Sequence, residues 1–429
     1  MNETSPLNNG GDSGRWRIVV MAFISNFIGI GIGFYAFGVF FKPLAEHFNW
    51  SRALVAWGPG VGLLISAIYA PRVGNAADKY GMRPLLIGGS ITVAISLVML
   101  GFMRNFWQFI LFWGVVFSIA NIHLGDIVTG SAVARAYPEK RGAAIGLAAV
   151  GVSFGGVAMP PFAQWVIDNW GWRVGFGAMG MTALALVCLP AVFFMRGVKE
   201  TPAQIEDCAD ESDIECAVGP EKSWTRAEAL RSSRFWKMIA VFGLGYLPLG
   251  TMLVQQVPFL TDMGIPATRA AWVLSFTAAM GMVGKVFWGS LFDRFEGRWT
   301  IACSFAMQAF SIWWLLRAET LLDTIIFGLF FGLGMGGTVP MHTAMRVRQF
   351  GPRYLGAIMG VSSPAIMLAQ AGGGPLAGWI FDTTGTYRAA FYFFIVCYLL
   401  GILVILTLRD PDRTQYTRVA LDKEQASSL

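Results

Sequence analysis

Charged residues are scarce in this chain. Aspartate, glutamate, lysine and arginine together make up 14% of its 429 residues, whereas hydrophobic residues make up 55%. A soluble domain carries about 25% charged residues. So little charge argues against a soluble enzyme and predicts a protein surrounded by lipid.

Motifs for metals, redox chemistry and nucleotides are also missing. The five cysteines are spaced neither as a zinc site nor as a redox CxxC pair, so we interpret them as free. No Gly-x4-Gly-Lys-Ser/Thr loop is present to bind ATP, and no Ser-His-Asp or metal constellation is visible. We therefore expect no enzyme activity, no cofactor, no metal and no ATP-driven pump. The polar start of the chain lacks the pattern of a cleaved signal peptide, so the first apolar run is expected to stay as a helix.

Long apolar runs dominate what is there. A membrane-spanning helix needs about 20 mostly apolar residues, and twelve such runs occur, too long for strands and without alternating polarity. We predict an all-α integral membrane protein with twelve transmembrane helices. The runs are 17–41, 53–76, 84–103, 107–134, 143–165, 174–195, 236–260, 270–292, 299–317, 321–345, 355–380 and 387–408.

One long polar segment, 198–235, separates six runs from the other six. It carries a cluster of six acidic residues between Glu206 and Glu215, which is typical of a solvated linker. The predicted organisation is a tail at 1–16, a six-helix bundle at 17–197, the linker at 198–235, a second bundle at 236–408 and a tail at 409–429.

Lysine and arginine are distributed unevenly about the predicted helices. With twelve spans, 24 of the 32 basic residues lie on the side of the termini and linker, seven lie on the opposite side, and Lys285 lies within a run. Positive charge accumulates on the cytoplasmic side of membrane proteins. We therefore expect both termini in the cytoplasm and the protein in the cell's inner membrane. The same asymmetry explains the net charge of +6 without a nucleic-acid partner.

The two halves also resemble each other at an offset of 214 residues. The segment from Pro161 to Asp168 (PFAQWVID) corresponds to the segment from Pro375 to Asp382 (PLAGWIFD), and Gly171 corresponds to Gly385. Matched proline, tryptophan and aspartate are difficult to obtain by chance between apolar helices. The repeat predicts two pseudo-symmetric six-helix bundles that enclose a cavity and rock about it.

A second repeated motif lies at an offset of 215 residues. It reads GNAADKYGMR from Gly74 and GSLFDRFEGR from Gly289. The first copy resembles the cytoplasmic signature between helices 2 and 3 of the major facilitator superfamily, and the second resembles its echo between helices 8 and 9. The resemblance implies a latch on the cytoplasmic side, closed when the cavity faces outward, whose glycines let helix ends approach closely. The latch residues are Gly74, Asp78, Lys79, Arg83, Gly289, Asp293, Arg294 and Arg298.

The end of the first run narrows the resemblance. Phe40-Phe41-Lys42-Pro43-Leu44, followed by Trp50-Ser51-Arg52, is similar to the monocarboxylate transporter branch and its bacterial relatives. Eukaryotic members carry a substrate-binding lysine in helix 1, and the stretch from Tyr35 to Gly38 has none. In this branch, a position in helix 8 typically carries an arginine that contacts the substrate carboxylate, and Lys285 lies in the corresponding run.

Charges within a bilayer cost about 2.5–3.5 kcal/mol each, so those present tend to be functional. Lys285 lies eight residues before Asp293 and is our candidate for binding a substrate anion; a lysine that snorkels to the membrane surface is the alternative. His123 and Asp126 are three residues apart in one run, so one helix face can carry both, and we predict a proton-coupling pair. Further candidate substrate-binding groups are Asn26, Tyr35, Tyr246, Gln256, Gln370 and His342.

Three functions fit these features. The first is a secondary transporter that moves a small organic anion, in particular a monocarboxylate, together with a proton across the bilayer. The second is efflux of an amphipathic or drug-like compound by the same fold. The third is a receptor that binds a solute without moving it, which the short tails disfavour because they hold no signalling domain.

Overall fold

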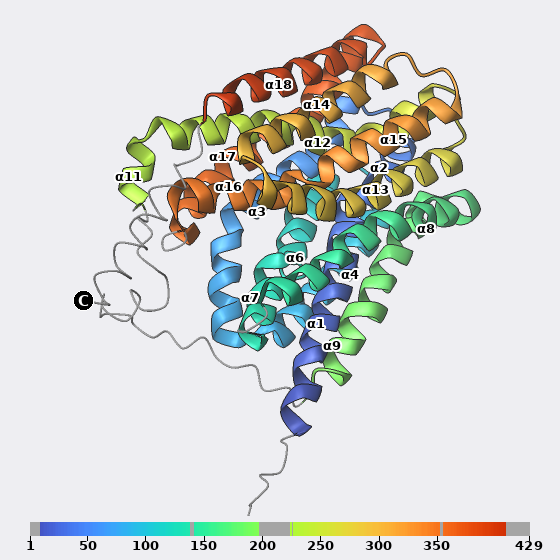
Figure 1. Ribbon diagram of the computed structural model, residues 1–429. Helices are drawn as coiled ribbons and strands as arrows, with labels where there is room; N and C mark the ends of the chain where they lie inside the picture. Colours follow the sequence, from blue (N-terminus) through green and yellow to red (C-terminus); the bar gives the residue numbers. More distant parts are fainter. Residues whose placement is uncertain (1–8, 138–140, 197–223, 225, 352–354, 409–429) are drawn as a thin grey trace, which may run out of the picture.

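The computed structural model describes residues 9–137, 141–196, 224, 226–351 and 355–408, and all regular secondary structure within them is helical (Figure 1). The first half contains α1 (Asn9–Ile30), η1 (Gly31–Ala36), α2 (Phe37–Phe48), α3 (Arg52–Tyr80), α4 (Met82–Gly101), α5 (Phe106–Phe109), η2 (Ile110–Phe117), α6 (Ser118–Ile122), α7 (Asp126–Ala136), α8 (Arg141–Ala183), η3 (Leu184–Cys188) and α9 (Leu189–Phe193). The second half contains α11 (Arg226–Arg231), α12 (Ser233–Asp262), α13 (Ala267–Arg294), α14 (Gly297–Leu315), α15 (Leu321–Gly336), α16 (Thr338–Phe350), α17 (Leu355–Thr384) and α18 (Arg388–Leu406).

The helices account for twelve crossings of a bilayer. Nine helical stretches in the described residues are long and apolar enough to span a membrane. One of them, Ala144–Phe193, contains the sharp bend at Gly171 and therefore crosses twice. The helices α14 and α17, with 19 and 30 residues, complete the set. The predicted fold class is thus confirmed. Residues 1–8, 409–429 and most of 198–235, where tails and linker were predicted, lie outside the described residues.

The sequence repeat is visible in the backbone. Gly171 and Gly385, which correspond at the 214-residue offset, have φ angles of +80° and +71°. These angles lie in a region that glycine enters without the steric cost of a side chain. Each glycine follows the repeated Pro-to-Asp segment and starts the turn into the next span. The duplicated sequence therefore builds the same corner twice.

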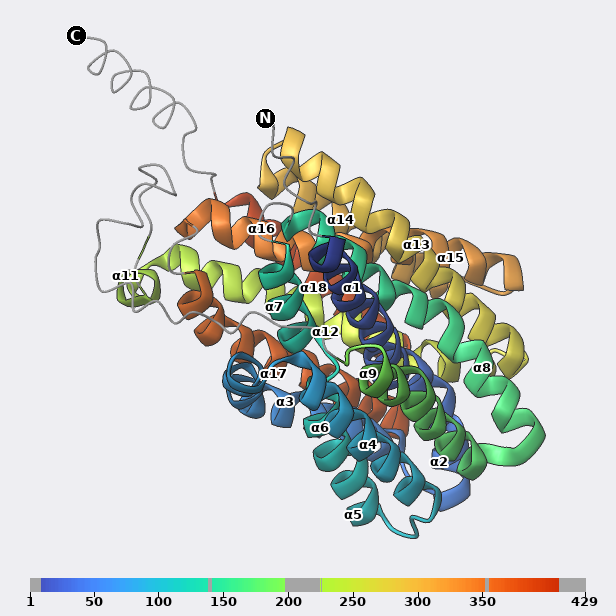
Figure 2. The ribbon, with the colours of Figure 1, turned by 90° about the horizontal axis from the view of Figure 1, so that it is seen from below.

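The two halves have separate hydrophobic cores. One core contains buried residues from Ile18 to Met195 together with Val254, and the other contains residues from Ala229 to Leu408 together with Tyr35 and Val39. The second half lies across the top of Figure 1 and the first half extends below it. Where the halves meet, α3 packs against α17 and α8 packs against α13, as Figure 2 also shows.

Glycines allow the closest of these helix contacts. A Cβ atom on Gly155 would lie 2.4 Å from the carbonyl oxygen of Phe27, so α8 and α1 touch through their backbones. A Cβ atom on Gly378 would lie 2.5 Å from the backbone nitrogen of Ala53, which brings α17 equally close to α3. Small residues serve this purpose in membrane helices, where dispersion and backbone contacts replace the hydrophobic effect.

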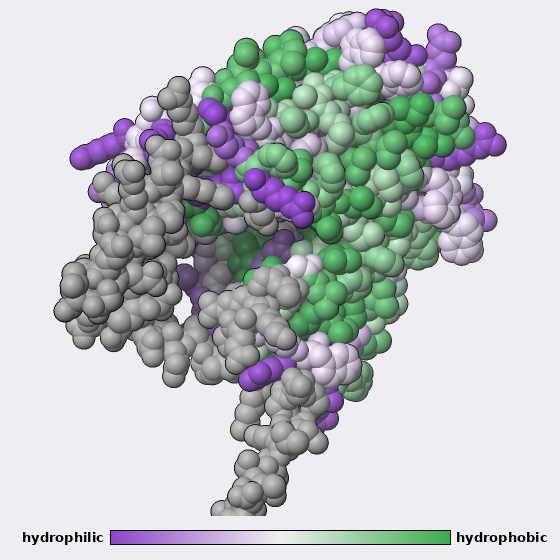
Figure 3. Space-filling view, in the orientation of Figure 1, coloured by the Kyte–Doolittle hydropathy of each residue, from purple (hydrophilic) through white to green (hydrophobic). Residues whose placement is uncertain are grey.

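The outer surface is apolar. Large hydrophobic side chains such as Ile68, Phe193 and Val286 are 67%, 73% and 75% exposed. Figure 3 shows hydrophobic residues over much of both halves, with hydrophilic residues gathered near the ends of the helices. A soluble protein does not leave so large an apolar area in water. This surface is suited to lipid.

The glycine contacts give a matched test of packing. We expect Gly155→Val to lower the melting temperature of the detergent-solubilised protein, because the added side chain overlaps α1, and overpacking costs about 1–3 kcal/mol. Gly146→Val, on the same helix, is the control, because no atom lies within 4 Å of a Cβ at that position. Equal melting temperatures for the two variants would show that the α1–α8 contact is not tight.

Candidate functional site

The two halves are joined at the end of the molecule away from both termini, here called the distal end. The carboxylate of Asp382, on α17, accepts hydrogen bonds from the backbone nitrogens of Arg52 and Ala53 at the start of α3, both at 2.9 Å. The carboxylate of Asp168, on α8, accepts from the hydroxyl of Thr268 at the start of α13, at 3.1 Å. Asp168 and Asp382 are the last residues of the two repeated segments. Each therefore holds the beginning of a helix in the opposite half, where a negative charge is favoured.

Ion pairs strengthen this end. Asp262, at the end of α12, contacts Arg52 at 2.5 Å and Lys42 at 3.2 Å. The guanidinium of Arg52 also donates to the hydroxyl of Tyr387 at 2.9 Å and lies 3.7 Å from the centre of the Phe381 ring. Lys42 and Arg52 belong to the Phe-Phe-Lys-Pro-Leu and Trp-Ser-Arg motifs. We call Lys42, Arg52, Asp168, Asp262, Thr268 and Asp382 the distal gate.

At the opposite, proximal end, the described latch contacts stay within one half. Asp78 pairs with Arg135 at 2.8 Å, and both belong to the first half. Arg83 donates to the carbonyl oxygens of Ala191 and Val192, at 3.2 and 3.0 Å. Arg83 thereby binds carbonyl groups at the end of the sixth span, where positive charge is favoured.

The second copy of the motif behaves similarly. Arg298 pairs with the neighbouring Glu296 at 2.6 Å, and Arg294 is exposed. Lys79 of the first copy lies 5.2 Å from the ring of Tyr80, and the side chain of Asp293 lies outside the described residues. In this conformation, the helix ends at Gly74 and Gly289 are not in close approach. A Cβ on Gly74 would meet only an ordinary contact, and one on Gly289 would meet nothing.

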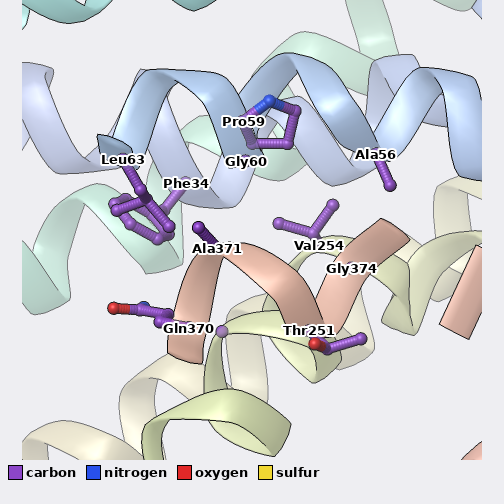
Figure 4. A pocket seen from close by; sticks show the side chains of 11 residues that line it. Phe34, Ala56, Pro59, Gly60, Leu63, Thr251, Val254, Gln370, Ala371 and Gly374 are labelled. Carbon is purple, nitrogen blue, oxygen red and sulfur yellow. The ribbon is translucent and has the colours of Figure 1, made fainter. Parts of the chain in front are cut away.

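Among the described residues, the two halves are thus in contact at the distal end and apart at the latch. Figure 3 shows a hollow between the halves with hydrophilic residues in its wall. Deeper than the distal gate, a cavity of about 20 Å³ lies between α3, α12 and α17. In Figure 4, Ala56 and Pro59 of α3 face Ala371 and Gly374 of α17 across it. A space of this size holds one water molecule and no organic substrate.

A polar cluster joins the two halves on the proximal side of this closed region. Lys285, on α13, donates from its ammonium group to the hydroxyl of Ser153, on α8, at 2.9 Å. Lys285 also interacts electrostatically with Asp126, and Asp126 is hydrogen-bonded to the side chain of Asn26. Asn26 is buried on α1 and accepts a hydrogen bond from Thr129 at 3.3 Å. Lys285, Asp126 and Asn26, all predicted from the sequence, thus lie together; we call them, with Ser153 and Thr129, the interface cluster.

His123 does not join them. The expectation that one helix face carries His123 and Asp126 is wrong, because α6 ends at Ile122 and α7 begins at Asp126. The ring of His123 bonds to the carbonyl of Ile119 at 2.9 Å and lies beside Tyr69. The break frees the carbonyl of Leu124, which accepts a hydrogen bond from Ser25 of α1 at 2.7 Å. Asp126 begins its own helix, where its carboxylate is favoured, and its side chain is exposed.

A second polar cluster lies within the C-terminal half. The rings of Tyr246, on α12, and His342, on α16, have centroids 5.6 Å apart. One helical turn beyond His342 is Arg346, which interacts electrostatically with both. The side chain of Arg346 is only 1% exposed. From the sequence, Arg346 was counted among the cytoplasmic loop cations and was not predicted as a site residue. The signal was its spacing of four residues from His342, which places both on one helix face.

The remaining predicted groups are dispersed. Tyr35 is buried in η1, with its ring against Gly156 of α8 and Ala278 of α13. Gln256 donates to Thr277 at 3.1 Å and joins α12 to α13. Gln370 packs on Gly250 and lines the small cavity of Figure 4. In this conformation, Gln256 and Gln370 make contacts between helices.

Comparison with known proteins decides the family. The sequence profile of the Major Facilitator Superfamily matches residues 22–284 and 249–428. The chain belongs to the major facilitator superfamily. It is therefore a multi-pass membrane transport protein and not an enzyme.

Relatives within the superfamily are more specific. The chain is 25% identical over 415 residues to Monocarboxylate transporter 13 of Rattus norvegicus, covering 95% of this chain and 91% of that protein. It is 24% identical over 450 residues to Monocarboxylate transporter 2 of Homo sapiens, covering 100% and 92%. A solved bacterial homologue of the human lysosomal transporter Spinster, described as inward-facing and unoccupied, shares the fold with a TM-score of 0.65 and 18% identity, covering 92% of this chain and 95% of that one.

The distal gate of this superfamily member can be tested directly. We expect Arg52→Ala to shift the protein toward a state opened at the distal end, because it removes the contacts with Asp262 and Tyr387. Charged hydrogen bonds contribute about 2 kcal/mol, so the ratio of the two states should change by roughly 10-fold or more. The measurement is the distance distribution between spin labels on Trp107 and Leu322, which lie at the distal ends of the two halves.

The control is Arg388→Ala, which removes an exposed cation at the same end. Arg388→Ala should leave the distance distribution unchanged. If Arg52→Ala gives the parental distribution as well, Arg52 does not hold the gate closed.

Proposed function

We propose that this chain is a secondary active transporter that moves a small organic anion, in the simplest case a monocarboxylate, together with a proton. The position of Lys285 carries the proposal. Its ammonium group extends from one half to a hydroxyl of the other half, at 2.9 Å, within a membrane-spanning region. Two relatives across nearly the whole chain are named monocarboxylate transporters, which supports the same substrate class.

A fixed cation between the halves suits an anionic substrate. An anion that leaves water must recover its lost hydration from charge or hydrogen-bond donors. Lys285 supplies the charge, and Ser153 and Asn26 supply neutral hydrogen-bonding groups beside it. The cluster contains residues from both halves. The contacts of an anion bound there therefore change when one half moves against the other.

Asp126 gives a reason for proton coupling. In this structure, Asp126 and the candidate substrate site share one cation, Lys285. When a substrate carboxylate takes Lys285, the carboxylate of Asp126 loses its counter-charge within a membrane-spanning segment. Protonation of Asp126 then removes the unpaired charge. Anion and proton are thus bound together and released together, and His123 takes no part.

The transport cycle follows from the two ends. We propose that the halves, with boundaries near 17–197 and 236–408, rock about the interface cluster. The distal gate closes one side in this structure, and the latch around Asp78 and Arg294 closes the other side in the alternate state. The asymmetry of lysine and arginine favours a cytoplasmic position for the proximal end.

Lys285 provides the first functional test. Lys285→Ala should reduce carboxylate uptake into proteoliposomes to background, because the counter-charge is lost. Lys285→Arg should retain part of the uptake, since the charge stays and only its geometry changes. Arg104→Ala, which removes an exposed cation in a distal loop, is the control and should transport normally. Near-normal uptake by Lys285→Ala would favour a snorkelling lysine and would rule out this anion site.

Asp126 provides the second test. Asp126→Asn removes the competitor for Lys285, so anion binding should stay equal or become tighter. Accumulation driven by a pH gradient should fall to background, because no group releases the proton. Exchange of labelled for unlabelled substrate, which needs no net proton movement, should persist. Parental accumulation by the variant under the same gradient would exclude Asp126 as the proton carrier.

A further inference from the structure

Arg346 is a buried cation for which the described residues provide no carboxylate partner. Its side chain lies in α16 and is only 1% exposed. Its guanidinium donates one long hydrogen bond, of 3.5 Å, to the hydroxyl of Ser363, and its Nε atom is buried without a hydrogen-bond partner in the described residues. The groups that act on it electrostatically are Tyr246 and His342, and neither is a carboxylic acid.

A buried cation of this kind is stabilised by a bound anion. Removing a guanidinium from water costs several kcal/mol unless a negative charge and hydrogen bonds replace the water. Arginine presents five N–H donors in a planar fork that fits a carboxylate through two parallel bonds. The surroundings offer further groups for the same ligand, because His342 has a buried Nε2 atom without a partner and the phenol of Tyr246 lies beside its ring.

The surroundings also hold these groups in place. The ring of His342 lies against Phe242 of α12, with centroids 4.0 Å apart. Tyr246 is one turn beyond Phe242 on the same helix, so both members of the polar pair are fixed by one helix–helix contact. Ser363, on α17, contacts the guanidinium of Arg346 from a third helix. The cluster is therefore built from α12, α16 and α17, which belong to the same half as Lys285.

The distance from Lys285 can be followed along α15 and α16. A Cβ atom on Gly336 would lie 2.8 Å from the backbone nitrogen of Lys285, so these two residues are at one level. His342 is six residues further on, roughly 9 Å along a helix axis. Helical side chains lean toward the N-terminal turn, which brings the guanidinium of Arg346 back toward the level of His342. The backbone of Lys285 and the guanidinium of Arg346 are thus separated by roughly 10 Å along this axis.

That separation limits the ligand. A ligand that contacts both cations therefore needs two anionic groups separated by a short chain. A four-carbon dicarboxylate is a ligand of this kind. A monocarboxylate of the same length reaches one cation and leaves the other unpaired.

We propose that Arg346, with His342 and Tyr246, forms a second anion-binding position, and that the transporter binds short dicarboxylates more tightly than monocarboxylates of equal length. The inference rests on the proposed function, because it takes Lys285 as the first anion position. It changes the substrate class from one carboxylate to two. It also gives Tyr246 and His342 a role beside the guanidinium.

The experiment compares succinate with butyrate, which has the same number of carbons and one carboxylate. Binding to the purified full chain is measured by calorimetry, with the parent, Arg346→Gln, Arg346→Lys, Lys285→Ala and the exposed-cation control Arg388→Gln. We expect the parent to bind succinate at least 10-fold more tightly than butyrate. Arg346→Gln should remove that difference and leave butyrate binding unchanged, which also shows that the variant is folded. Lys285→Ala should weaken both ligands, and Arg388→Gln neither.

Several results would overturn the inference. Equal affinities of the parent for the two acids would do so, as would unchanged succinate binding by Arg346→Gln. If Arg346→Gln does not fold, Arg346→Lys decides: it should weaken succinate and spare butyrate, and equal loss of both would count against a second position. Butyrate binding that depends on Lys285 without a preference for succinate would leave the proposed function intact. If the parent bound neither acid, the proposed function itself would fail.

Discussion

Two aspartates related by the internal repeat determine the shape of this molecule. Asp168 and Asp382 each reach across the midline to the start of a helix in the other half, so the duplication creates two crossed attachments at one end. With that end held, the described helices separate at the other end and leave the hollow seen in Figure 3. The ion pairs of Arg52 and Lys42 with Asp262 add to this arrangement without changing its geometry.

Within the membrane region, one charged group also contacts several partners. Lys285 is shared between Ser153 of the opposite half and the carboxylate of Asp126. A cation that already has two partners binds a third by displacing one of them, and a carboxylate that loses its counter-charge takes up a proton more readily. On the proposed function, coupling therefore needs no dedicated relay. It arises because one charge must satisfy two carboxylates in turn.

The helical fold and its two halves could be predicted from the sequence, because they depend on the length of the apolar runs and on the internal duplication. Twelve runs, the matched Pro-to-Asp segments and the lone Lys285 predicted the fold, its two halves and the central cation. The partners across the midline were not predictable, because a repeat shows equivalence and not contact. The break between His123 and Asp126 was missed although Gly125 precedes an acidic residue, a common start of a helix. Arg346 was assigned to a loop because run boundaries were drawn by hydropathy, and α16 continues to Phe350.

The latch glycines show what a single conformation leaves unexplained. Gly74 and Gly289 precede Asp78 and Asp293 in both copies of the motif, yet no close neighbour in this structure requires a glycine at either position. By contrast, Gly155 and Gly378 are needed here because backbone atoms lie where a Cβ would be. If the halves rock about the interface cluster, the proximal helix ends approach as the distal ones separate. The space at Gly74 and Gly289 is then the space that closure uses, and the bonds lost by Asp168 and Asp382 at the distal end are offset by contacts that the two latch copies gain.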